Sequence, residues 1–120
     1  MLAYESLSDQ AKVAGFSCGS TPLNDFLNNS ALTHQNMGFS KTTCVYDRSR
    51  NLVGYYTLAM STVEPDELPR GVTRGSPGYK IPTILNAKFA VDQRHTGQGY
   101  GTSMFKSILK TIANFLKTAA

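Results

Sequence analysis

The chain has 120 residues, of which 41% are hydrophobic, so it fits one domain, 1–120, that can bury a real core. No apolar run approaches 18 residues, no charged segment precedes a short apolar one, and the two cysteines lack dense spacing. We therefore expect no membrane span, secretion signal or disulfide scaffold, and a reducing cytoplasmic location, while the net charge of +4 fits either simple solubility or an acidic partner such as nucleic acid.

The first predicted element is a helix that follows residues 4–16, where no clear periodicity is present. Ser20 or Thr21 can cap this helix, and Pro22 lies in its first turn, where a missing N–H does no harm. Apolar residues then recur at helical spacing: Leu23, Phe26, Leu27 and Ala31. Gly38 closes the segment.

A β-hairpin is predicted next. Lys41–Tyr46 and Leu52–Val63 have the β-branched and aromatic content of strands, and Asp47–Asn51 supplies turn residues between them. Cys44 is expected to be a small buried hydrophobe. Because successive strand residues face opposite ways, we expect one of Tyr55 and Tyr56 in the core and the other exposed.

The segment Glu64–Pro82 contains prolines, glycines and basic residues and no periodicity. A loop of this length inside a domain is either a binding element or disordered. Its basic side chains, Arg70, Arg74 and Lys80, fit contact with a nucleic-acid backbone or a merely solvated loop.

From Ile84 to Leu116 the pattern predicts an apolar strand ending at Asp92, a glycine-rich turn at Gln93–Gly101, and an amphipathic helix from Thr102. Its apolar stripe is Met104, Phe105, Ile108, Leu109, Ile112, Phe115 and Leu116. Backbone N–H groups of such a turn converge on an anion, and the helix N-terminus adds partial positive charge, so a diphosphate is the expected guest. The dinucleotide fingerprint does not fit, because it requires its third glycine at the position of Thr102. The P-loop does not fit either, because it requires a lysine directly before Thr102 and Gly101 stands there.

Metal chemistry is not expected. The histidines His34 and His95 and the cysteines Cys18 and Cys44 lack metal-ligand spacing. His95 lies beside the glycine-rich turn, where it is either a phosphate contact or an exposed loop histidine.

The turn Gly97-Gln-Gly-Tyr-Gly101 after Ala90-Val-Asp92 resembles the acetyl-CoA loop of the GNAT superfamily of N-acetyltransferases, written Arg/Gln-x-x-Gly-x-Gly/Ala. The first position of that motif falls on Thr96, which departs from the pattern. Four segments in order resemble, more narrowly, the GNAT toxins of bacterial toxin–antitoxin pairs: Phe16–Leu27, Val53–Ala59, Ile81–Leu85 and Lys88–Asp92.

This resemblance implies an α/β (α+β) fold, with a mixed, mainly antiparallel sheet flanked by helices, as the N-terminal part of a GNAT domain. It implies acetyl transfer from acetyl-CoA to the amino group of aminoacyl-tRNA, a small DNA-binding antitoxin as partner, and no metal. Homodimer formation is left open.

The same resemblance implies which residues contact acetyl-CoA. The backbone of Phe89, Ala90 and Val91 would meet the pantetheine arm, and the diphosphate would be wrapped by Gly97, Gln98, Gly99, Tyr100, Gly101 and Thr102. Lys88 stands where these toxins often have arginine. The lysine keeps the positive charge but lacks the planar guanidinium group of arginine. The family's proton-donating tyrosine falls beyond Ala120, so no catalytic residue is assigned and the domain is expected to be incomplete at its C-terminus.

Two alternatives remain open. One is an inactive remnant that binds CoA or an antitoxin without turnover. The other is a GNAT enzyme that acts on a small-molecule or protein amine.

Overall fold

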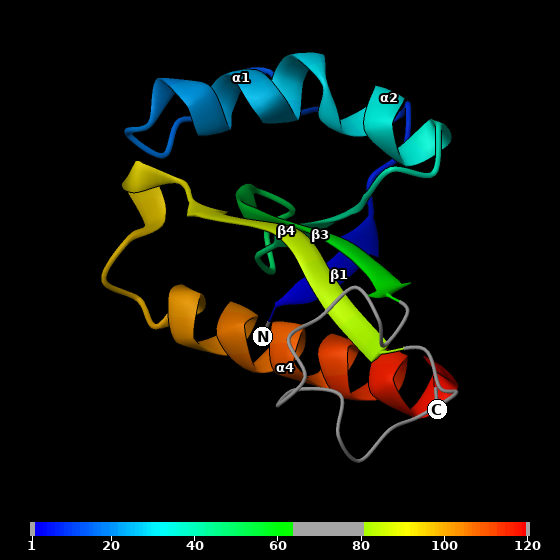
Figure 1. Ribbon diagram of the computed structural model, residues 1–120. Helices are drawn as coiled ribbons and strands as arrows, with labels where there is room; N and C mark the ends of the chain where they lie inside the picture. Colours follow the sequence, from blue (N-terminus) through cyan, green and yellow to red (C-terminus); the bar gives the residue numbers. More distant parts are fainter. Residues whose placement is uncertain (1, 64–80, 120) are drawn as a thin grey trace.

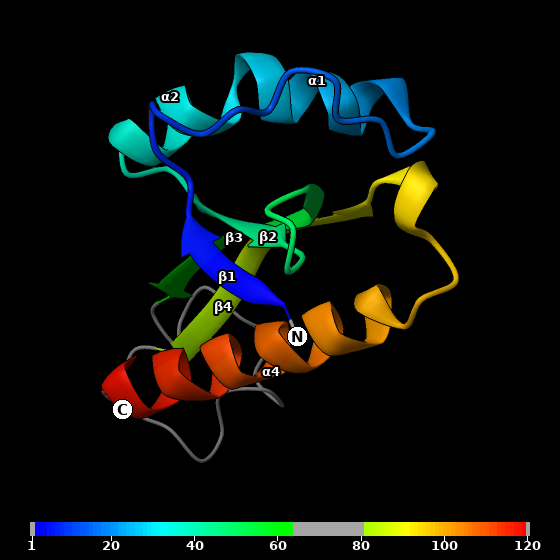
Figure 2. The same ribbon diagram turned by 180° about the vertical axis from the view of Figure 1, so that it is seen from behind.

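The computed structural model describes residues 2–63 and 81–119. Their elements, in chain order, are β1 (Ala3–Ser6), α1 (Thr21–Asn29), α2 (Ala31–Asn36), β2 (Lys41–Tyr46), β3 (Leu52–Val63), β4 (Ile81–Val91), the 3-10 turn η2 (Gln93–His95) and α4 (Tyr100–Ala119). The strands form one sheet in the order β1-β2-β3-β4, and every neighbouring pair is antiparallel. Helices α1 and α2 cover one face and α4 covers the other (Figures 1 and 2). The expected α+β class, with helices on both faces of an antiparallel sheet, is confirmed.

The hairpin has the predicted bounds, and its register pairs Cys44 with Tyr55. The first helix begins as predicted, because the Ser20 hydroxyl accepts the N–H of Leu23 at 3.4 Å and Pro22 lies in the first turn. The predicted helical segment is divided in two, since the backbone of Ser30 leaves helical geometry with φ −128°.

Strand β1 lies in the segment for which the sequence predicts no element. It pairs with β2, Ala3 opposite Tyr46 and Ser6 opposite Thr43. At four residues it is too short to show a period of its own, so its conformation depends on the neighbouring strand. Among the described strands, it forms one edge of the sheet and β4 forms the other.

Both faces of the sheet are covered at the centre of β3, and this corrects one expectation. Tyr55 and Tyr56 point to opposite faces as predicted, but their exposed fractions are 0% and 4%. Tyr55 packs beneath α1 and α2, and Tyr56 packs beneath α4. Both tyrosines are buried because a helix layer covers each face of the sheet at their position. Cys44 is buried as expected.

The boundaries of the last three predicted elements also shift. Strand β4 begins at Ile81, so Ile81 and Pro82 belong to a strand and not to the predicted loop. The rest of that loop, including Arg70, Arg74 and Lys80, lies outside the described residues. Helix α4 begins at Tyr100, two residues before the predicted Thr102.

Helix α4 rests on the sheet through a close approach at Gly54 in β3. A Cβ atom at this position would lie 2.7 Å from the Ala90 carbonyl oxygen and 2.7 Å from the Met104 sulfur. Met104 is completely buried, and Ile108 lies one turn further along the same stripe. A glycine is therefore what allows the helix to approach this part of the sheet. None of the helices in the described part of the chain is long and apolar enough to cross a membrane.

Candidate functional site

The C-terminal end of β4 forms one wall of the candidate site. The Asp92 N–H donates to the Val53 carbonyl at 2.7 Å, which fixes the hydrogen-bonding phase of the β3–β4 ladder. By the alternation of an antiparallel ladder, the peptide groups of Phe89 and Val91 point away from β3 toward the edge, and those of Ala90 point inward. Of the three residues predicted to offer backbone groups, two therefore present them at the sheet edge.

The glycine-rich loop leads from η2 into α4. Gly97 and Gly99 both have φ +79°, in the left-handed region that favours glycine, and no neighbouring atom lies within 4 Å of a Cβ built on either of them. These two residues thus bend the chain into the helix without steric cost.

The loop ends at the N-terminus of α4. Ser103 N–H donates to the Gly99 carbonyl at 3.2 Å, and this is the first bond of the helix. The N–H groups of Tyr100, Gly101 and Thr102 precede that bond and have no intrahelical acceptor. Unpaired donors of this kind, together with the helix dipole, bind anions such as a phosphate.

The strand wall and the loop lie side by side. A Cβ built on Gly101 would be 3.8 Å from the Phe89 ring and 3.8 Å from a methyl group of Val91. Phe89 and Val91 of the strand therefore adjoin Gly101 on one continuous surface, with outward peptide groups on the strand and N–H donors at the start of the helix.

A buried carboxylate, which the sequence analysis did not single out, holds this surface in place. Asp92 is 0% exposed and accepts the backbone N–H groups of Ser17 at 3.1 Å and Arg94 at 2.9 Å. The Arg94 side chain adds two bonds of 2.9 Å, from Nε and Nη2, and Nη2 also reaches the Gly15 carbonyl at 3.3 Å. An acidic residue that directly follows an apolar strand is the signal that could have identified it.

The electrostatics of Asp92 follow from these bonds. The Arg94 guanidinium, aided by the N–H groups of Arg94 and Ser17, holds the pKa of the Asp92 carboxyl well below its usual range, against the opposing effect of burial. The carboxylate thus stays charged and keeps the chain before α1 tied to the start of the loop, where Gln93 N–H also donates to the Ser17 carbonyl at 2.8 Å.

Two other predicted candidates lie on different sides of this surface. His95 is half-buried at the end of η2, with its ring centroid 6.5 Å from that of Tyr100. The ammonium of Lys88 lies 4.5 Å above the Phe26 ring, on the face covered by α1, so it points away from the α4 face. In residues 2–63 and 81–119 there is no cluster of three or more histidine, cysteine, aspartate or glutamate side chains that could hold a metal ion.

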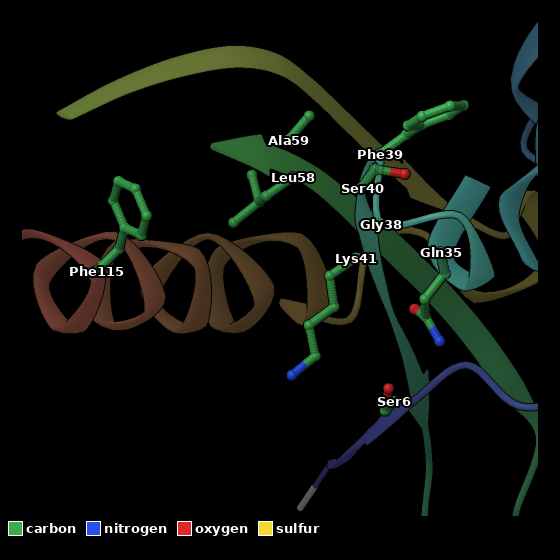
Figure 3. Close-up of a pocket in the computed structure, with 9 residues that line it drawn as sticks. All are labelled: Ser6, Gln35, Gly38, Phe39, Ser40, Lys41, Leu58, Ala59 and Phe115. Atoms are coloured by element: carbon green, nitrogen blue, oxygen red, sulfur yellow. The ribbon is translucent and has the colours of Figure 1, made fainter. Parts of the chain in front are cut away.

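A cavity of about 450 Å³ lies near the other end of α4 and is not part of this surface. Figure 3 shows Phe115 of α4, Leu58 and Ala59 of β3, and Lys41 of β2 around it. Among the described residues that line it, Lys41 is the single charged one. The described lining therefore lacks the row of backbone N–H donors that the N-terminus of α4 offers to an anion.

No family model matches the chain, but individual known proteins are similar to it. A protein named tRNA-acetylating toxin, from Mycobacterium tuberculosis (strain ATCC 25618 / H37Rv), is 33% identical over 109 residues, which are 89% of this chain and 63% of that protein. The chain thus spans less than two thirds of the length of this relative.

Solved structures show the same likeness. AtaT complexed with acetyl-methionyl-tRNAfMet matches with a TM-score of 0.71 and 26% identity, over 93% of this chain and 69% of the other. AtaTR bound with acetyl-CoA matches with a TM-score of 0.68 and 26% identity, over 92% and 67%. In sequence and in fold, over part of their length, the chain resembles the GNAT acetyltransferase toxins.

Proposed function

We propose that the chain binds acetyl-CoA at the surface formed by β4 and the N-terminus of α4, and acts as an N-acetyltransferase on the amino group of aminoacyl-tRNA. The observation that carries this proposal is the loop with left-handed Gly97 and Gly99, which leads into a helix N-terminus beside β4, an edge strand of the sheet in the described part of the chain. The relative named tRNA-acetylating toxin supports the choice of acceptor. The structural neighbour bound to acetyl-CoA supports the choice of donor.

The described residues supply the part of the site that holds the acetyl donor. The N–H groups from Gly97 to Thr102 surround the diphosphate, and the outward peptide groups of Phe89 and Val91 bond the pantetheine arm. The amine nitrogen then attacks the thioester carbon, the new C–N bond forms, the C–S bond breaks, and the amine proton is lost while the thiolate gains one. Because a thioester is already activated, holding the two reactants together accounts for much of the rate.

The same proposal includes a partner and a location. The relative is named a toxin, and such enzymes need a neutralising partner, so we propose a small DNA-binding antitoxin and a cytoplasmic reaction where tRNA is charged.

The binding step can be tested with two glycines that share one backbone geometry. Gly99 and Gly38 both have φ +79° and open space around a Cβ, but Gly38 lies after α2, away from the loop. Gly99→Ala should weaken acetyl-CoA binding about tenfold or more in calorimetric titration, because the strained loop no longer aims its N–H groups. Gly38→Ala carries the same backbone strain and should bind normally. Equal affinities for both variants and the parent would remove the loop from the site.

Turnover is tested separately. The protein is incubated with acetyl-CoA and charged tRNA, and the aminoacyl-tRNA is examined by mass spectrometry. N-acetylated aminoacyl-tRNA is the expected product. Acetyl-CoA binding without any acetylated tRNA would favour the inactive alternative, and transfer to free amines or peptides alone would favour a different acceptor.

A further inference from the structure

A second basic surface lies beside the glycine-rich loop, in a cavity of about 200 Å³. The residues around it come from three separate segments: the chain before α1, the turn between β2 and β3, and η2. In the described part of the chain, its ionisable lining residues are all basic: Lys12, Arg50, Arg94 and His95. No carboxylate of residues 2–63 or 81–119 lines it.

Several of these basic side chains keep unused hydrogen-bond donors. Among the described residues, the side chains of Lys12 and His95 have no hydrogen-bond partner, and Arg94 bonds through Nε and Nη2 but not through Nη1. Arg50 is different, because its guanidinium forms two bonds with Glu5, at 2.6 and 3.0 Å. Lys12, His95 and Nη1 of Arg94 are therefore the groups available to a ligand.

Three carboxylates lie near the cavity but outside its lining. Glu5 is paired with Arg50, and Asp92 is buried against Arg94. Asp47 accepts hydrogen bonds from the backbone N–H and the side-chain amide of Asn51. Since each carboxylate is bonded within the protein, the open side of the cavity presents cations and N–H donors.

The size and position of the cavity suit a phosphate group. A water molecule occupies about 30 Å³ of liquid, so 200 Å³ holds a phosphate with some of its hydration water. His95 connects the cavity to the loop, because its ring faces Tyr100 at the start of α4. A molecule bound at the loop can thus extend into the cavity.

We propose that this cavity is a phosphate-binding site distinct from the diphosphate loop, in which Lys12, Arg94 and His95 hold a phosphate monoester or diester. The phosphate has two sources, the 3′-phosphate of CoA or the backbone of the tRNA. Only these two sources rest on the proposed function.

The test uses the double variant Lys12→Ala/His95→Gln, which leaves the Asp92–Arg94 pair intact. The matched control is Lys106→Ala, an exposed lysine on α4 outside the cavity. Calorimetric titration with CoA and with dephospho-CoA, which lacks the 3′-phosphate, separates the first source. Fluorescence anisotropy with tRNA at several salt concentrations tests the second.

Either of two results supports the proposal. A loss of about tenfold in affinity for CoA with no change for dephospho-CoA identifies the 3′-phosphate, at the size expected for charge-assisted hydrogen bonds. Unchanged binding of both CoA forms, with weaker tRNA binding and a salt slope reduced by about one to two, identifies an RNA phosphate.

Two results overturn it. Unchanged affinity for CoA, dephospho-CoA and tRNA in a folded double variant shows that the cavity binds no phosphate. An equal loss for both CoA forms places the effect on the neighbouring loop. The Gly99→Ala experiment stands apart from these outcomes, since it tests the diphosphate loop and leaves Lys12 and His95 in place.

Discussion

The two faces of the sheet are held to their helices in different ways. On the face under α1 and α2, polar bonds join the layers: the Tyr55 hydroxyl donates to the Leu23 carbonyl at 2.7 Å. The Gln35 side chain donates to the Leu7 carbonyl at 2.7 Å and accepts from the Thr42 N–H at 2.8 Å. Because hydrogen bonds are directional, these bonds fix the orientation of both helices, in addition to the apolar packing between the layers.

On the other face, α4 is seated mainly by apolar packing. Met104 and Ile108 lie in one cluster with Val45 and Val53, and the Tyr56 hydroxyl is 2.8 Å from that of Ser107. Helix α4, which carries the candidate anion site, is therefore positioned by the fit of its apolar side chains against the sheet. Its placement depends on a few close contacts. Changes that alter volume should disturb this face more than changes of charge.

The largest effect is expected from truncating the central contact of α4. Met104→Ala should lower the free energy of unfolding by about 3 kcal/mol, because it opens a cavity at a completely buried position. Its neighbour Phe105 is 56% exposed, and Phe105→Ala should change stability by less than about 0.5 kcal/mol. Urea denaturation measures both. Similar losses for the two variants would show that α4 is not seated on the face we describe.

A smaller effect is expected from adding one methyl group at Gly54. Gly54→Ala should cost about 2 kcal/mol, because the new Cβ would lie 2.7 Å from the Ala90 carbonyl and the Met104 sulfur and α4 must move away. It should also weaken acetyl-CoA binding, since the loop moves with the helix. The control is Gly101→Ala, whose Cβ meets its neighbours at an ordinary 3.8 Å, and whose stability should not fall. A Gly54→Ala protein as stable as the parent would contradict the close approach.

The smallest effect concerns alkaline pH and the face under α1 and α2. Burial raises the pKa of Cys44 from 9.0 to about 11, and burial also raises the pKa of Tyr55 from 10.0 to about 12. At alkaline pH the folded chain therefore keeps protons on these two groups that the unfolded chain releases. The free energy of unfolding is undiminished below pH 9 and falls as the pH rises toward the folded pKa values.

We expect a loss of about 1–2 kcal/mol between about pH 8.5 and about pH 10, measured by urea denaturation at each pH. Cys44→Ala should flatten the first part of this slope. Met104→Ala should lower the whole curve without changing its slope, because it acts on the opposite face. A slope that Cys44→Ala leaves unchanged would mean that the thiol does not titrate as described.

Elements governed by nearby residues could be predicted from the sequence. The hairpin strands have the predicted ends because β-branched residues flank a turn in which Asp47 accepts the N–H groups of Ser49 and Asn51. The strand, glycine loop and helix were also found in the predicted order. Each of these signals lies within one short segment of chain.

Features that depend on distant residues were missed or wrongly predicted. Strand β1 exists because β2 lies beside it, and Tyr56 is buried because α4 covers it. The predicted apolar stripe of α4 was too wide, since Leu109 is 50% exposed and Phe105 faces solvent as well. Periodicity shows which residues share a helix face, but it does not show how much of that face another layer covers.

The bond between Asp92 and Ser17 also has a consequence for the order in which the protein is made. The strands of the sheet are neighbours in chain order, so each can pair soon after it leaves the ribosome. The Ser17 N–H, in contrast, waits for a carboxylate 75 residues later in the chain. The bond at Ser17 thus forms only after β4 has been synthesised, whereas Leu7 in the same segment can already bond to Thr42 and Gln35. The link between the segment before α1 and the start of the glycine-rich loop is therefore completed late in translation.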